Sequence, residues 1–147
     1  MDNSIENNPC KLVDSILDEC LTDAMLEKSS KYKALRPEGG SVEEHVSEFC
    51  HLEEYLDEKN IIKIFKIQDF KSDIDAEYFI ESSNFNRQST VYIFIRQRKE
   101  SDNYVIVSFF KKHNIYKGNK AYWMLKEKIT GDECIVLYQH PNYKKEE

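Results

Sequence analysis

The spacing of apolar residues changes once along the chain, near Asn60. Before this point apolar residues recur every three or four positions, the spacing that places them on one side of an α-helix. After it, β-branched and aromatic residues alternate with polar ones, as in half-buried β-strands. The sequence therefore predicts an α+β fold, in which two N-terminal amphipathic helices pack on a mainly antiparallel sheet of about five to six strands.

Two start signals define the predicted helices. Asn8 precedes Pro9, a residue that suits the first helical position, and an apolar stripe then continues to Met25. Ser41 opens the second helix with Glu44 three residues later, the capping-box spacing in which each side chain binds the other residue's backbone N–H. The two stripes contain Leu12, Val13, Ile16, Leu17, Cys20, Leu21, Ala24 and Met25, and then Val42, Val46, Phe49, Leu52 and Leu56.

The second half of the chain contains six predicted strands. They lie at residues 61–67, 76–83, 89–98, 103–110, 121–129 and 133–140. Residues 99–103 and 130–132 connect strands as tight turns, and Gly131 suits a positive φ. Such short connections indicate antiparallel neighbours. Residues 121–129 also fit a helical stripe, so strand and helix both remain open for this segment.

The length of 147 residues and the hydrophobic share of 40% suit one globular domain. We expect a disordered tail at residues 1–8, a single domain at 9–142 and a charged C-terminal tail at 143–147. No apolar run approaches the length that spans a bilayer, and the N-terminus lacks the features of a secretion signal. The expected compartment is therefore the cytoplasm, with no membrane partner. The four cysteines are far apart, which favours reduced, mostly buried thiols.

The usual signatures of cofactor and metal sites are missing from the sequence. The four glycines form no phosphate-binding loop, and no pattern of cysteine, histidine or carboxylate residues has the spacing of a metal site. The sequence predicts neither a cofactor nor a metal.

Charge is distributed unevenly along the chain. The overall net charge is −6, but residues 1–60 hold 15 Asp and Glu against six Lys and Arg, a net of −9. Between Arg87 and Lys128 the balance reverses to ten Lys and Arg against three Asp and Glu, a net of +7. This asymmetry suggests two surfaces with different partners, or two halves that partly neutralise each other on folding.

Within the basic half, residues 89–129 resemble the closing strands of phage-encoded nuclease domains of the barnase, EndoU, colicin and RelE-like group. The shared features are the strand YIFI, a polar hairpin loop, a strand ending SFF, a basic loop with tyrosine and a final apolar run. The resemblance implies a sheet that cleaves RNA without a metal. It implies as candidate catalytic residues Arg87, Arg96, Ser108, His113 and Tyr116. The acidic helices of the first half depart from that pattern, since further sheet and a catalytic histidine are expected there.

The absence of a catalytic motif makes an interaction protein the leading hypothesis. A small acidic factor of the inhibitor or immunity type, from a bacteriophage or other mobile element, can act in a host–virus interaction by covering the basic surface of a target protein. The predicted partner-binding residues are Glu43, Glu44, Glu53, Glu54, Asp57 and Glu58. A metal-independent ribonuclease toxin that binds RNA is the alternative, and a homodimer formed through a strand edge is a third possibility.

Overall fold

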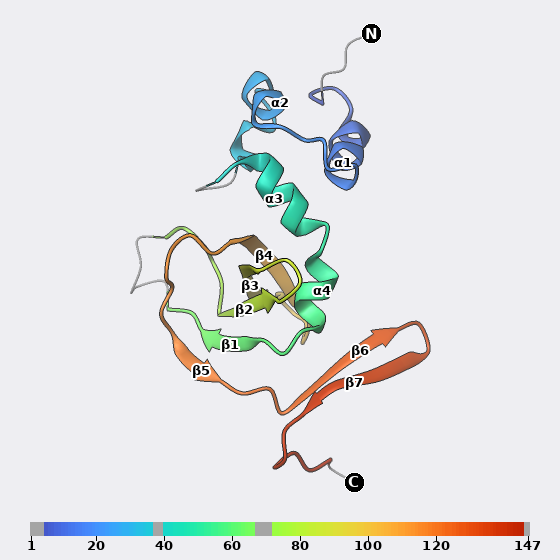
Figure 1. The fold of residues 1–147 in the computed structure, drawn as a ribbon, viewed down its shortest axis with the longest axis vertical. Helices are drawn as coiled ribbons and strands as arrows, with labels where there is room; N and C mark the ends of the chain where they lie inside the picture. The colour runs from blue at the N-terminus through green and yellow to red at the C-terminus, as the bar shows by residue number, and fades with distance from the viewer. Residues whose placement is uncertain (1–4, 37–39, 67–71, 146–147) are drawn as a thin grey trace. The chain divides into compact units, whose positions relative to one another are not determined.

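The computed structural model describes residues 5–36, 40–66 and 72–145, and it divides the chain into two compact units. The first unit is Met1–Leu52 and the second is Glu53–Glu147. A single domain over residues 9–142 stays a prediction. The α-helices lie in the first part of the chain and the strands in the second (Figure 1), which confirms the predicted α+β class with an antiparallel sheet.

In the first unit, residues 5–36 and 40–52 are described, and they form three α-helices and one short 3-10 helix. These elements are α1 (Pro9–Leu17), α2 (Asp23–Lys28), η1 (Lys33–Leu35) and α3 (Val42–Phe49). Their core is formed by six buried residues, Ile5, Leu12, Leu21, Leu26, Val42 and Val46. Ile5 belongs to the segment predicted as a tail, and residues 1–4 of that segment lie outside the described residues.

The prediction of one helix from Pro9 to Met25 is wrong. The chain leaves the helix after Leu17, and Glu19 adopts the left-handed conformation with φ of 55°. Thr22 then starts a new helix, because its hydroxyl accepts a hydrogen bond of 3.3 Å from the backbone N–H of Met25. A second N-cap inside a continuous apolar stripe was enough to split the predicted helix.

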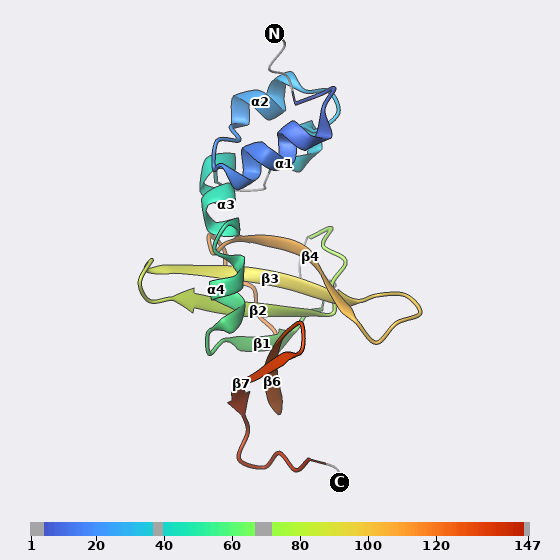
Figure 2. The same cartoon turned by 90° about the vertical axis from the view of Figure 1, so that its right-hand side faces the viewer.

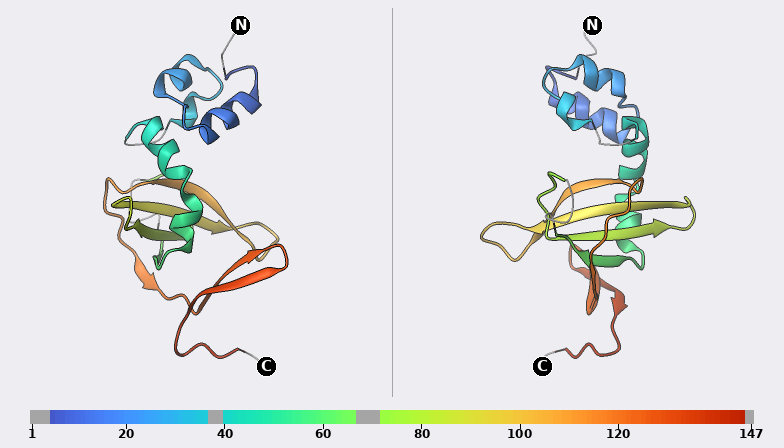
Figure 3. Two further views of the ribbon diagram at one scale, coloured as in Figure 1. Left: turned by 45° about the vertical axis from the view of Figure 1, so that its right-hand side comes forward. Right: turned by 90° about the vertical axis from the view of Figure 1, so that its left-hand side faces the viewer.

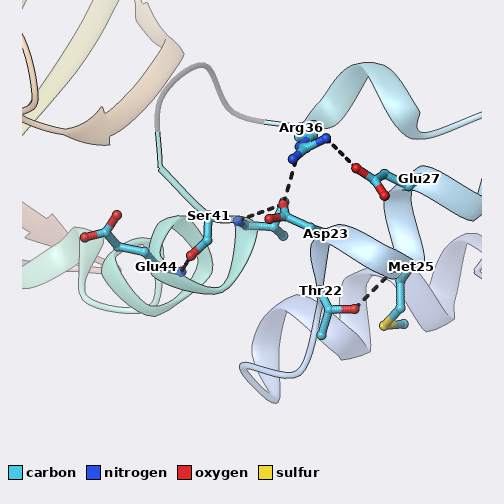
Figure 4. A network of polar contacts seen from close by, with 8 residues as sticks. Thr22, Asp23, Met25, Glu27, Arg36, Ser41 and Glu44 are labelled. Atoms are coloured by element: carbon cyan, nitrogen blue, oxygen red, sulfur yellow. Dashed lines mark hydrogen bonds and ion pairs between the residues drawn. The ribbon is translucent and has the colours of Figure 1, made fainter.

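The predicted start of the second helix at Ser41 is confirmed. The Ser41 hydroxyl accepts from the backbone N–H of Glu44 at 3.1 Å, whereas Figure 4 shows the Glu44 carboxylate pointing away from Ser41. The Asp23 carboxylate accepts from the N–H of Val42 at 3.1 Å and lies 3.6 Å from Arg36, which also binds Glu27 (Figure 4). These contacts hold the start of α3 to α2.

The second predicted helix is interrupted near Cys50 and His51, and it continues as α4 (Leu52–Asp57). The prediction of buried cysteines is also wrong. Cys10, Cys20, Cys50 and Cys134 all lie in the described part of the chain, where none of them forms a disulfide and all four are exposed. The first three fall at the ends of helices or after them, where the helical stripe no longer faces a core.

The described residues of the second unit form a five-stranded antiparallel sheet and a separate hairpin. The sheet has the order β4-β3-β2-β1-β5 and the hairpin pairs β6 with β7, as Figures 1 and 2 show. The strands are β1 (Ile61–Ile64), β2 (Tyr78–Asn84), β3 (Ser89–Gln97), β4 (Tyr104–Lys111), β5 (Asn119–Ala121), β6 (Leu125–Thr130) and β7 (Glu133–Gln139). Residue 67, the predicted end of the first strand, lies outside the described residues.

Residues 121–129, all of which the structure describes, contain no helix, so the helical alternative for this segment is wrong. The segment is nevertheless not one strand, because β5 ends at Ala121 and β6 begins at Leu125. Between them the Trp123 indole N–H donates to both the backbone carbonyl and the side-chain oxygen of Asn60, each at 3.1 Å. This anchor divides the predicted strand between the sheet and the hairpin.

The two faces of the five-stranded sheet are covered differently. On one face lies α4, as Figures 2 and 3 show, with Tyr55 fully buried and its backbone carbonyl accepting from the Ser82 hydroxyl at 2.6 Å. The Tyr55 ring lies 6.3 Å from the Phe109 ring. The acidic second helix therefore packs on the sheet through its C-terminal part. The other face holds the aromatic cluster formed by Phe65, Phe79, Tyr92 and Phe94, with Phe110 and Tyr116 packed against it.

Candidate functional site

The six carboxylates predicted to bind a partner are divided between the two units. Glu43 and Glu44 lie in the first turn of α3, in the first unit. The other four, Glu53, Glu54, Asp57 and Glu58, lie on α4 or directly after it, in the second unit. The structure therefore groups four of the six residues on one short helix and the residue directly after it.

The carboxylates of α4 make contacts within the second unit. Lys128 of β6 binds Glu53 at 2.5 Å and Asp57 at 2.6 Å, and these hydrogen bonds raise the pKa of Lys128. The Glu54 carboxylate accepts from the side-chain amide of Asn84 at 3.1 Å. A partner that used these three carboxylates would have to compete with groups already bound to them.

A different surface of the first unit combines negative charge with exposed apolar side chains. The outer side of α1 presents Val13 and Leu17, which are 53% and 67% exposed. Asp14 and Asp18 flank them, and Glu19 follows. We call these five residues the α1 surface. The sequence did not predict this surface, because Val13 and Leu17 fit the apolar stripe that was expected to face the core. The sequence feature that indicates the surface is the width of this stripe, which exceeds what a helix of nine residues can bury on one side.

The carboxylates of the α1 surface differ from those of α4 in their contacts. Within the described residues, no ion pair engages Asp14, Asp18 or Glu19, and all three residues are exposed. A protein partner can bury such neighbouring exposed apolar side chains, with the carboxylates at the polar rim of the contact. The α1 surface is therefore the candidate partner-binding site.

The residues implied by the nuclease resemblance are spread along the sheet. Arg87 lies in the turn before β3, and His113 lies just after β4. These two positions are at the same end of the sheet, because the backbone N–H of Lys112 binds the carbonyl of Thr90 at 2.8 Å. Arg96 lies toward the opposite end of β3, 3.8 Å from Asp75.

The remaining two nuclease candidates lie on or against the face with the aromatic cluster. Ser108 is opposite Phe94 in the ladder between β3 and β4. Tyr116 packs into the cluster, with its ring 5.4 Å from that of Tyr92, and its backbone N–H donates to the Tyr92 hydroxyl at 3.3 Å. The structure thus brings Arg87 and His113 to one end of the sheet, whereas Tyr116 packs over the aromatic face between Tyr92 and Phe94 and Arg96 lies toward the other end.

A half-buried ion cluster lies beside the same aromatic rings. Glu81 of β2 binds Lys63 of β1 at 3.1 Å and Lys112 at 3.0 Å. Burial raises the pKa of Glu81, but the two lysine hydrogen bonds outweigh it and hold the pKa below the ordinary value of 4.5. The same contact with Glu81 raises the pKa of Lys112. The cluster joins β1, β2 and the end of β4.

We expect Glu81→Gln to lower the free energy of unfolding of the second unit by about 1–2 kcal/mol at neutral pH, because two partly buried ammonium groups lose their carboxylate. Because the folded-state pKa of Glu81 is lowered, its contribution is complete above the unfolded-state pKa and disappears as the pH falls through the folded-state pKa. Urea unfolding of both proteins over a range of acidic pH measures this. A difference between them that stays constant into strong acid contradicts the role of Glu81.

The described part of the chain shows neither a metal cluster nor a membrane-spanning helix. Among residues 5–36, 40–66 and 72–145, no three histidine, cysteine or carboxylate side chains are grouped so that they could hold a metal ion. No described helix is both long and apolar enough to cross a bilayer. Comparison with known proteins finds no match among family models, curated sequences or solved structures.

Proposed function

We propose that this protein is a non-enzymatic, protein-binding inhibitor or immunity-type factor of a phage or mobile element, which acts by covering a basic surface of its target. The α1 surface carries the proposal. Val13 and Leu17 supply apolar area that a partner can bury, and Asp14 and Asp18 select a partner with positive charge around an apolar pocket. Such a surface can occlude a nucleic-acid-binding cleft, which is basic.

The division of charge between the units supports this assignment. Residues 1–52 contain 11 Asp and Glu against five Lys and Arg, a net of −6, while residues 53–147 contain 16 of each. The whole net charge of the chain thus belongs to the unit that carries the α1 surface. Complementary charge accelerates the encounter with a basic partner and discriminates against acidic ones.

The variant Asp14→Lys/Asp18→Lys tests the α1 surface. We expect it to lose capture of a partner from a bacterial host lysate, measured by quantitative mass spectrometry. With the purified partner, we expect association slowed at least about tenfold at low salt, since charge reversal converts attraction into repulsion. Leu17→Ala should weaken the same complex mainly through faster dissociation, because it removes buried apolar contact.

The matched control is Asp102→Lys/Asp132→Lys, which makes the same change of charge at exposed turn positions of the second unit. This control should retain the partner. If the control and the α1 variant lose the partner equally, general charge is responsible and the α1 surface is not the binding site. If both variants retain every partner, the protein-binding proposal for α1 fails.

A metal-independent ribonuclease is the competing proposal, and the position of Arg87 and His113 at one end of the sheet favours it. An imidazole next to cationic side chains can move a proton from a ribose hydroxyl while the cations bind the phosphate. Purified protein incubated with labelled RNA in EDTA separates the two proposals. Cleavage that disappears in His113→Ala supports the nuclease, and intact RNA removes it.

A further inference from the structure

A cleft of about 290 Å³ lies in the second unit, where the chain passes from β5 to β6. Figure 1 shows this connection between the sheet and the hairpin. Its walls come from the segment after α4, from β5 and from both strands of the hairpin. The lining includes the aromatic residues Tyr122, Trp123 and Tyr138 and the lysines Lys59, Lys120 and Lys126. We call it the Trp123 cleft.

The central aromatic side chain of the cleft is held in place by hydrogen bonds. The Trp123 indole N–H donates to two oxygens of Asn60, and the Asn60 amide in turn donates to the carbonyl of Tyr55 at 3.0 Å. Asn60 is itself buried. Tyr122 is 75% exposed, so its ring is available at the mouth of the cleft. The site therefore combines a fixed indole with an exposed phenol ring.

The charge of the cleft is positive. Of the residues that the structure describes, one carboxylate, Glu58, and three lysines line it. Lys126 lies 5.3 Å from the centre of the Trp123 ring and donates to the carbonyl of Glu58 at 2.9 Å and to the Asn60 side-chain oxygen at 3.2 Å. Burial lowers the pKa of Lys126, whereas the negative charges of Asp57 and Glu58 act to raise it. An anion bound here would stabilise the charged ammonium group.

The geometry points to a nucleoside phosphate as the ligand of the Trp123 cleft, either free or as an unpaired residue of a single strand. A cleft of this size suits one small molecule. Aromatic side chains stack on nucleobases regardless of base identity, and lysines bind phosphate. Both requirements meet in one site that uses none of the residues of the α1 surface, so this inference is independent of the protein-binding proposal.

Trp123 is the only tryptophan of the chain, so its fluorescence reports directly on the cleft. We expect AMP to change the tryptophan emission of the full-length protein in a saturable titration. A single-stranded oligodeoxynucleotide is titrated in parallel. If AMP and the oligodeoxynucleotide bind with similar affinity per site, a free nucleotide is sufficient as the ligand. If the oligodeoxynucleotide binds more tightly, the nucleotide that occupies the cleft belongs to a nucleic acid.

Two variants at exposed positions locate the binding without disturbing the anchor of Trp123. Tyr122→Ala removes a stacking surface and should weaken binding about tenfold. Lys120→Glu should weaken it by a similar factor and reduce its salt dependence. Lys99→Glu, with the same change of charge in the β3–β4 turn, should bind like the unmodified protein. The inference is overturned if neither probe gives a saturable signal, or if all three variants bind equally.

Discussion

Phe94→Ala is expected to lower the free energy of unfolding of the second unit by about 3–5 kcal/mol, the range for truncating a buried aromatic side chain. Phe94 is fully buried on β3. Its ring lies 5.1 Å from that of Phe65, 5.3 Å from Tyr116 and 5.4 Å from Phe110, so one truncation removes contacts to three separate segments. Urea unfolding followed by Trp123 fluorescence measures the effect in this unit.

The control is another phenylalanine of the same unit, Phe85, which lies in the turn between β2 and β3 and is 91% exposed. Phe85→Ala deletes the same atoms from a position without a core, so its effect should stay within about 0.5 kcal/mol. Equal losses in the two variants would mean that the aromatic cluster does not stabilise the sheet.

Gly118→Ala is the second change expected to have a large effect. Gly118 lies just before β5, where a Cβ atom would come 2.4 Å from the backbone carbonyl oxygen of Ile64 and 3.0 Å from the Phe79 ring. The carbonyl belongs to the backbone of β1 and the ring to the buried cluster, so neither can move away alone. We expect a loss of about 2–3 kcal/mol in the free energy of unfolding, the usual effect of overpacking.

Gly131→Ala provides the comparison, because this glycine is restricted by its conformation and not by its neighbours. Gly131 has φ of 60° in the β6–β7 turn, and a Cβ atom there would meet nothing within 4 Å. Its replacement should cost only about 1–2 kcal/mol, and Gly131→Asn should recover part of it. A larger loss at Gly131 than at Gly118 would contradict the close approach at β1.

Local signals in the sequence predicted many of the observed elements. The Ser41 cap, the alternating strands and the turn at Gly131 each depend on neighbouring residues, and each appears in the structure. The predicted helix to Met25 failed for a local reason as well. Thr22 is a good N-cap. The apolar stripe continues through this position, however, and the prediction followed the stripe and not the cap.

The candidate site depended on contacts between residues far apart in sequence. The α4 carboxylates looked like a continuous acidic face, but Lys128 reaches Glu53 and Asp57 across more than 70 residues. No spacing rule indicates such a pair. The same holds for Trp123 and Asn60, whose hydrogen bonds divide a predicted strand and form the wall of the Trp123 cleft.

The sequence by itself determined the α+β class, the change from helices to strands near Asn60 and the uneven charge, because period, caps and composition are properties of neighbouring residues. Only the tertiary structure decided which charges are engaged and which are open. The carboxylates of α4 contact groups of the second unit, and those of the α1 surface have no ion-pair partner among the described residues. That difference arises from chain folding, which selects a few long-range pairs from many that charge alone would allow.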